Sequence, residues 1–150
     1  MIVTRKKSKV MRSKKVLIDT SIWIEYFQNR SRMLSKRVDE YLSQSKVFVP
    51  RFVIAELIQS SRSTKETAVI ERFIEAFNII DQNEETWIKA GHLSHQLKKE
   101  GENVHLIDCY LAVIAKDNDC HILTLGRQFE DIRKIMDIQL VTLETLETEE

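Results

Sequence analysis

Three acidic residues of this chain lie where a short β-branched run gives way to a helical pattern. Asp19 ends one such run, Glu56 follows a second run by little more than one helical turn, and Asp108 opens an apolar helical pattern. The carboxyl ends of the strands in an open α/β sheet border one ligand-binding crevice, so acids far apart in sequence can meet there. Carboxylate oxygens suit Mg²⁺ and Mn²⁺. The acids therefore predict a divalent-metal site, and its chemistry would be phosphodiester hydrolysis by an activated water.

Each of these acids also has a purely structural explanation. Asp19 could act only as a helix N-cap, a position that favours aspartate. Glu56 alone would be an ordinary solvated charge on a helix, and Asp108 alone a first-turn acid that suits the helix dipole. The occurrence of all three together, at comparable junctions, favours the metal site over three unrelated roles.

The elements that would position these acids alternate between strand and helix. Short β-branched runs predict strands, and apolar residues at intervals of three and four predict helices. The predicted strands are 16–19, 47–49, 78–80, 120–124 and 138–141, and the predicted helices are 21–28, 33–45, 51–62, 65–77, 84–99, 108–115 and 129–136. This alternation predicts an α/β fold with a central parallel sheet of about four to five strands, flanked by helices and connected by right-handed crossovers.

Composition and charge favour one domain with charged ends. The 150 residues are 43% hydrophobic and 31% charged, which is ordinary for a folded domain. Residues 1–15 hold seven of the 23 Lys and Arg residues and no acid, and residues 144–150 hold four glutamates. The chain therefore divides into a basic arm at 1–15, a domain at 16–143 and an acidic tail at 144–150. The arm could neutralise nucleic-acid phosphates or be merely solvated.

Cysteine usage and hydropathy restrict where the protein acts. Cys109 and Cys120 form no CxxC pair and no secretory signal is apparent, which favours a reducing cytoplasm. No apolar run approaches the roughly 20 residues of a membrane helix, so no membrane partner is expected. No glycine-rich phosphate loop follows a predicted strand, which argues against P-loop and dinucleotide-binding classes.

Four segments, in this order and spacing, resemble the PIN-domain family. They are VLIDTSIWI at 16–24, VIAEL at 53–57, LIDCYLA at 106–112 and ILTLGRQF at 122–129. Within that family the chain is most similar to the VapC-type toxins of toxin–antitoxin pairs. The resemblance implies a three-layer α/β fold and an Mg²⁺- or Mn²⁺-dependent endoribonuclease, the toxin component of a type II toxin–antitoxin pair. It also implies an RNA substrate, a homodimer and a cognate antitoxin.

The resemblance assigns roles to particular residues. Asp19, Glu56 and Asp108 match the acids that hold the metal and support catalysis in the family. Ser21 and Thr124 match small polar positions that help to orient the site.

The chain departs from the family just after Thr124. The family usually has an Asp two or four residues beyond this Thr, where this chain has Gly126 and Gln128. A fourth acid would complete the site or help to hold a second metal. Its absence leaves a second hypothesis open, namely a catalytically weakened or inactive PIN-like module that binds RNA or an antitoxin.

Overall fold

The computed structural model describes residues 14–141 of the chain. Nearly all of the predicted basic arm at 1–15 and the whole acidic tail at 144–150 lie outside these residues. The division of the chain into arm, domain and tail therefore stays a prediction.

A five-stranded parallel sheet lies at the centre of the fold, in the order β3-β2-β1-β4-β5. Its strands are β1 (Val16–Ile18), β2 (Val47–Pro50), β3 (Asn78–Ile80), β4 (His121–Leu123) and β5 (Leu140–Val141). The chain first moves from β1 through β2 to β3 and later returns to β4, on the other side of β1. The strand order therefore reverses between β1 and β4, and the carboxyl ends of strands at such a switch point form the usual ligand site of α/β sheets.

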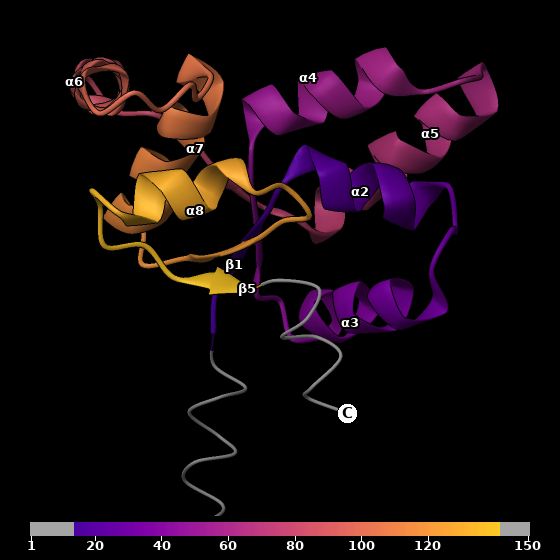
Figure 1. Cartoon of the computed structure of the whole chain (residues 1–150). Helices are drawn as coiled ribbons and strands as arrows, with labels where there is room; N and C mark the ends of the chain where they lie inside the picture. The colour runs from indigo at the N-terminus through magenta and orange to yellow at the C-terminus, as the bar shows by residue number, and fades with distance from the viewer. Residues whose placement is uncertain (1–13, 142–150) are drawn as a thin grey trace, which may run out of the picture.

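Helices cover the sheet on both faces, which gives three layers (Figure 1). The connections from β1 to β3 contain α2 (Thr20–Phe27), α3 (Arg32–Ser43), α4 (Arg51–Ser60), α5 (Thr64–Phe73) and the 3₁₀ turn η1 (Ile74–Ala76). The later connections contain α6 (Thr86–Lys99), α7 (Leu106–Asp117) and α8 (Gln128–Arg133). Helix α2 packs on α3 and α4, whereas α7 packs on α6 and α8. Because right-handed crossovers that run in opposite directions cover opposite faces, this arrangement confirms the predicted α/β fold.

Element boundaries differ from the prediction where local hydrogen bonds compete with regular structure. The predicted helix at 65–77 ends early and continues as the turn η1. The predicted helix at 84–99 begins only at Thr86. Ahead of it, Asn83 Oδ1 accepts hydrogen bonds from the Glu85 backbone N–H at 2.9 Å and from the Thr86 hydroxyl at 3.2 Å. An Asn side chain that bonds the backbone two residues on forms a turn, which delays the helix.

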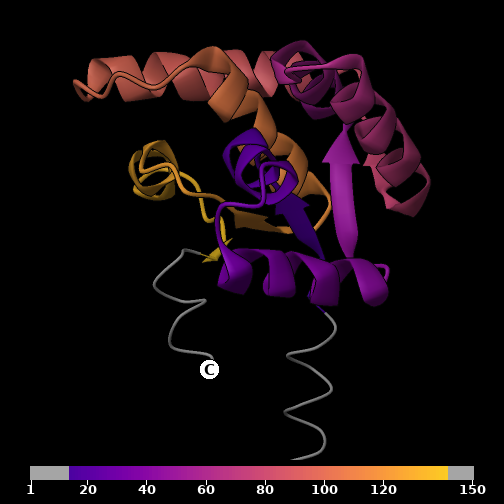
Figure 2. The same cartoon turned by 90° about the vertical axis from the view of Figure 1, so that its right-hand side faces the viewer.

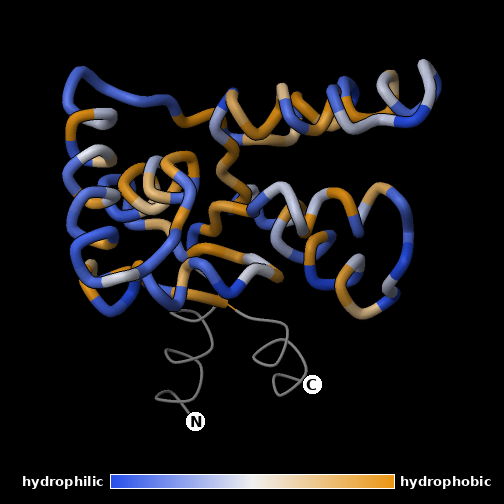
Figure 3. The backbone as a smooth tube through the Cα atoms, turned by 45° about the horizontal axis from the view of Figure 1, so that its top comes forward, coloured by the Kyte–Doolittle hydropathy of each residue, from blue (hydrophilic) through white to orange (hydrophobic). Residues whose placement is uncertain are grey.

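The two elements that lead into the predicted site are the most deeply buried. Every residue of β1, Val16–Ile18, has no exposed surface, as expected of a central parallel strand. Helix α7 is buried on all sides from Cys109 to Ala115. Hydrophobic residues follow the inner segments and hydrophilic residues the outer helices and connections (Figure 3). Asp19, after β1, and Asp108, in the first turn of α7, are therefore attached to rigid parts of the core.

Both cysteines, Cys109 and Cys120, are free and buried. Burial raises the pKa of each thiol to about 11.

Among residues 14–141, no helix combines the length and apolar character needed to cross a bilayer.

Candidate metal site

Asp19 joins β1 to α2, and only 6% of its surface is exposed. Its Oδ1 accepts a hydrogen bond from the Thr20 backbone N–H at 2.8 Å, so Asp19 is the N-cap of α2. Its Oδ2 accepts two further bonds, from the hydroxyls of Ser21 and Thr124, each at 2.9 Å. Both supporting residues named from the sequence thus contact Asp19. Together these donors fix the carboxylate at the switch point between β1 and β4.

Glu56 comes from a different connection and is half-buried in the second turn of α4. Helix α4 starts directly at the end of β2, so its first turns lie at the carboxyl edge of the sheet (Figure 2). The Thr20 hydroxyl donates to Glu56 Oε1 at 2.7 Å. Thr20 therefore connects two of the predicted acids, through its backbone N–H to Asp19 and through its side chain to Glu56.

Asp108 is the third residue of α7 and is 9% exposed. Burial raises its pKa above the usual range, and the negative charges of Asp19 and, to a smaller extent, Glu56 raise it further. A side-chain hydrogen bond from Gln128 and the charge of His105 act in the opposite direction. Asp19 and Glu56 are therefore close enough to act on the charge of Asp108, although the three acids come from distant parts of the chain.

Asp108 is coupled electrostatically to Asp19 and Glu56, but the three acids do not form a closed cluster. Within residues 14–141, no group of three or more His, Cys, Asp or Glu side chains is arranged to hold a metal ion. Two of the carboxylates are instead engaged by hydroxyl groups, since Thr20 donates to Glu56 and Ser21 and Thr124 donate to Asp19. The assignment of Asp19, Glu56 and Asp108 as metal ligands stays a prediction.

The loop between β4 and α8 reinforces this site. Thr124, which is 2% exposed, donates to Asp19 and accepts a hydrogen bond from the Gly126 backbone N–H at 2.9 Å. The Leu125 backbone N–H donates to the Ser21 hydroxyl at 3.3 Å. The loop thus holds both hydroxyl groups that orient Asp19.

Two residues with a direct role in this network were not singled out from the sequence as supporting residues. Thr20 directly follows Asp19, and this position in the sequence is the only feature that points to a role for it. In the sequence, Gln128 stands out as the place of a missing acid and not as a hydrogen-bonding group. The nearby acids Glu130 and Asp131 form ion pairs within α8 and its end, with Arg133 at 3.8 Å and Lys134 at 3.2 Å respectively.

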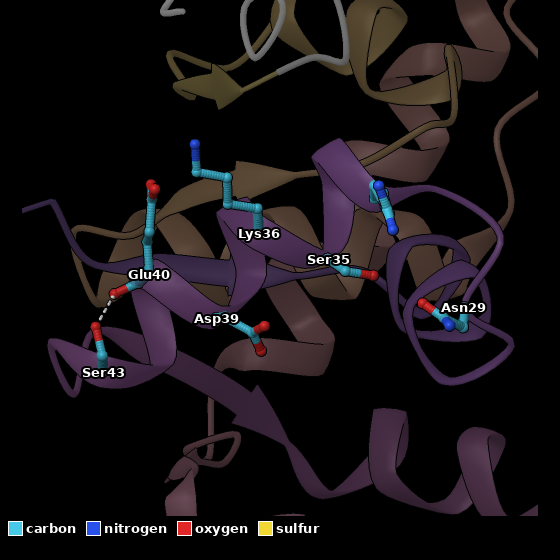
Figure 4. A pocket seen from close by; sticks show the side chains of 7 residues that line it. Asn29, Ser35, Lys36, Asp39, Glu40 and Ser43 are labelled. Atoms are coloured by element: carbon cyan, nitrogen blue, oxygen red, sulfur yellow. Dashed lines mark hydrogen bonds between the residues drawn. The ribbon is translucent and has the colours of Figure 1, made fainter.

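A separate hollow of about 550 Å³ lies on the outer side of α3. It is lined by Asn29, Arg32, Ser35, Lys36, Asp39, Glu40 and Ser43 (Figure 4). These side chains carry both signs of charge, and α3 lies near the amino end of β2, opposite to the end where α4 begins (Figure 2). None of the predicted site residues lines the hollow, so it is distinct from the candidate metal site.

A three-layer α/β domain with a parallel five-stranded sheet and acids at its switch point is a PIN-like architecture. The chain belongs to the PIN domain family, whose model matches residues 16–135.

Similar proteins agree with this assignment. The chain is 26% identical over 132 residues to Ribonuclease VapC1 of Haemophilus influenzae strain R2866, a match that covers 82% of this chain and 93% of that protein. It is 30% identical over 110 residues to Ribonuclease VapC1 of Methanocaldococcus jannaschii, with 73% and 74% covered. A crystal structure of DNA-bound VapBC from Salmonella typhimurium matches the fold with a TM-score of 0.72 and 23% identity, and covers 86% of this chain and 98% of that chain. These relatives confirm the resemblance to VapC-type proteins.

Proposed function

We propose that this chain is a metal-dependent endoribonuclease, the toxin component of a type II toxin–antitoxin pair, which hydrolyses phosphodiester bonds in RNA. The observation that carries the proposal is that Asp19, Glu56 and Asp108 come together: Thr20 hydrogen-bonds to both Asp19 and Glu56, and the pKa of Asp108 is raised by burial and then by the charges of Asp19 and Glu56. Asp19 lies at a strand–helix junction, Glu56 in the second turn of α4 and Asp108 in the first turn of α7, all in a PIN-domain fold. The names of the VapC1 ribonucleases to which the chain is similar support RNA as the substrate.

The donor set fits a hard divalent cation. It consists of three carboxylates and the hydroxyls around them, and oxygen donors of this kind suit Mg²⁺ or Mn²⁺. A bound cation would offset the burial of the Asp108 carboxylate and its repulsion by Asp19 and Glu56, which together raise the pKa of Asp108. Asp19, Glu56 and Asp108 would hold the ion directly or through water. When bound, Mg²⁺ or Mn²⁺ supplies polarisation of the scissile phosphate and a lower pKa of the attacking water.

The remaining work falls to groups of the chain itself. Ser21 and Thr124 keep the Asp19 carboxylate in one orientation through their hydroxyls. One of the three carboxylates accepts the proton of the attacking water. Arg127, which is exposed at the start of α8, contacts the RNA backbone and neutralises a phosphate.

Metal removal tests the proposed function. The purified chain should cut structured RNAs at discrete positions with Mg²⁺ or Mn²⁺, and a chelator should abolish the cuts until excess metal is added back. Glu56→Gln keeps an acceptor for Thr20 and removes only the charge, so we expect cleavage to fall by at least about 100-fold. Glu71→Gln, at an exposed position of α5, is the matched control and should cleave like the parent.

Two results would contradict the proposal. Cutting that survives the chelator, or that survives in Glu56→Gln, would mean a contaminating nuclease or a different site. Binding of RNA or antitoxin without any cutting would instead favour the inactive PIN-like module. The lack of a closed metal cluster within residues 14–141 is the observation that favours this second candidate.

Thr124→Val tests the support of Asp19. Valine keeps the shape of the side chain but removes the hydroxyl that donates to Asp19 and accepts from the Gly126 N–H. Groups that orient a metal ligand typically cost about 10–100-fold in metal affinity or activity when they are removed. We expect a loss of this size in Mn²⁺ affinity, by calorimetry, and in RNA cleavage, with Thr124→Ser close to the parent. An equal loss in both variants would show that the hydroxyl is not the reason.

The proposed partners follow from the family and from one surface. Trp87 is 44% exposed and stacks on Tyr110 with ring centroids 4.3 Å apart, and Ile88 beside it is 62% exposed. Phe52 and Leu106 are exposed as well. An apolar surface of this kind suits a protein interface, and we propose that it pairs two copies in a homodimer.

A cognate antitoxin would cover the three acids and place a basic residue against them. Both the antitoxin and the RNA substrate would meet the protein in the cytoplasm.

A further inference from the structure

The hollow on the outer side of α3 is lined only by polar and charged side chains (Figure 4). Arg32 and Lys36 stand one helical turn apart on α3, and both are exposed. Ser35 lies three residues after Arg32, so the three side chains share one face of the helix. This face therefore presents two positive charges and a hydroxyl around a cavity of about 550 Å³.

The acids of the hollow already have partners, whereas its cations do not. Asp39 Oδ1 accepts a hydrogen bond from the Tyr26 hydroxyl at 2.5 Å, and Glu40 Oε2 pairs with Arg37 Nη1 at 3.2 Å. The two cations on α3, in contrast, form no ion pair with any other of residues 14–141. The hollow therefore has positive charge available for an anion.

The Ser35 hydroxyl is an independent indication of a ligand. Its Oγ atom is buried, but no group in the described part of the chain forms a hydrogen bond with it. A buried hydroxyl without a partner costs free energy, and such groups are usually paired with protein, water or a ligand. An anion held by the two cations on the same face of α3 would be close enough to accept the Ser35 proton.

Further cations lie at the same end of the sheet. Lys14 and Lys15 come just before β1, and Lys46 comes just before β2, so all three stand at the amino edge of these parallel strands. The Val16 N–H donates to the Lys46 carbonyl at 2.9 Å, which joins the two segments. Helix α3 lies across this end, away from α4 (Figure 2). A polyanion in the hollow would therefore meet more positive charge nearby.

We propose that this hollow is a second RNA-binding site, in which Arg32 and Lys36 hold phosphates of the RNA backbone and the Ser35 hydroxyl donates to one of them. Phosphate contacts of this kind fix the position of a nucleic acid without reading its sequence. The Asp39 carboxylate, in the same hollow, can accept the 2′-hydroxyl that distinguishes RNA from DNA. The inference goes beyond the proposed function, because it concerns binding away from the acids and requires no metal.

The position of the hollow predicts which RNAs it favours. Helix α3 lies at the amino end of β2, and α4, which carries Glu56, begins at its carboxyl end. The two sites are therefore separated by at least the length of this four-residue strand, about 13 Å at roughly 3.3 Å per residue. An RNA must extend over this distance to contact both, so folded RNAs should benefit from the hollow and a dinucleotide should not.

The test is binding of a fluorescein-labelled RNA hairpin to the full chain, measured by fluorescence anisotropy in EDTA at several salt concentrations. The double variant Arg32→Gln/Lys36→Gln removes both charges and should raise the Kd by about 10-fold. The slope of log Kd against log salt should fall by about 2, because each lost phosphate contact lowers it by about 1. Ser35→Ala should raise the Kd by about 5-fold with the slope unchanged, since it removes a hydrogen bond but no charge.

Matched controls separate this site from general charge effects. Lys98→Gln/Lys99→Gln removes two exposed cations from the last turn of α6 and should bind the hairpin like the parent. A DNA hairpin of the same sequence should bind the parent more weakly than the RNA hairpin does. Glutamine is a good helix former, so the α3 variants should unfold at the parental temperature. If the double variant fails to fold, Lys36→Gln alone decides the question, with a change of about 1 in the slope.

The outcomes distinguish this inference from the proposed function. Parental affinity and salt slope in Arg32→Gln/Lys36→Gln would overturn the inference, as would an equal loss in Lys98→Gln/Lys99→Gln. Equal affinity for the DNA hairpin would overturn the assignment to RNA. These results would leave RNA cleavage at the acids unaffected. Conversely, a parent that binds the hairpin through α3 but cuts no RNA would contradict the proposed function and support the inference.

Discussion

Asp19→Asn should lower RNA cleavage by at least about 100-fold while the fold stays intact. Asparagine is as good an N-cap as aspartate, and its Oδ1 can still accept the bond from the Thr20 N–H. The charge is lost, however, and an amide NH₂ group replaces the oxygen that accepts from Ser21 and Thr124. Removal of a group that only orients a metal ligand typically lowers metal affinity or activity by about 10–100-fold. Loss of the charge on the ligand itself should therefore lower RNA cleavage by more.

The measurement is the initial rate of RNA cleavage with Mn²⁺, together with thermal unfolding of each variant. Asp131→Asn is the matched control, because it removes one carboxylate charge from α8, where Asp131 pairs with Lys134 at 3.2 Å. It should cleave like the parent. Unchanged cleavage in Asp19→Asn would show that the nuclease site lies elsewhere. A large fall in thermal stability with little loss of cleavage would mean that Asp19 is mainly a helix cap.

Part of the candidate site was visible in the sequence because it depends on short-range chemistry. Asp19 and Ser21 stand two residues apart at a strand–helix junction, and this spacing alone brings the Ser21 hydroxyl to the carboxylate. Thr124 directly follows the neighbouring strand β4, and parallel pairing of β1 with β4 places it beside Asp19. A pattern of strand ends is therefore enough to predict that these three residues meet.

The rest of the site depends on how the helices pack, which the sequence pattern does not specify. Thr20 reaches Glu56 because α2 packs on α4. Gln128 lies on the side of Asp108 because α8 packs on α7. The alternation of apolar residues predicts that these helices exist, but not which polar side chains meet between them.

The strands and helices themselves were predictable where burial decides them. Val16–Ile18 is a continuous apolar run, which predicts a buried strand. In the structure this strand fills the centre of the sheet. The prediction was less accurate where a polar side chain determines where a helix begins, as in the turn that Asn83 forms before α6. Such turns depend on the orientation of one amide, whereas a buried strand depends on several apolar residues together.

Replacing Trp23 should have the largest effect on stability, since its ring joins α2 to the segment after α5. Trp23 has no exposed surface, and its ring centroid lies 4.9 Å from that of Phe77 and 5.8 Å from that of Phe27. Truncation of a buried aromatic residue to alanine typically costs about 3–5 kcal/mol. We expect Trp23→Ala to lose about this amount in urea unfolding, a large part of the roughly 5–15 kcal/mol that stabilises a domain. Helix α2 also carries Thr20 and Ser21, so Mn²⁺ affinity should fall in this variant too.

The second tryptophan is the matched control, because Trp87 is 44% exposed and Trp87→Ala leaves no cavity in the core. It should cost about 1 kcal/mol, mainly the stacking on Tyr110.

Trp23→Phe separates packing from hydrogen bonding, because Trp23 Nε1 is buried and donates to no acceptor within residues 14–141. An unpartnered buried donor costs about 1–3 kcal/mol, so its removal should offset part of the lost ring volume. Trp23→Phe should therefore be much more stable than Trp23→Ala, and equal stability of the two would show that packing of the ring contributes little to the stability of the domain.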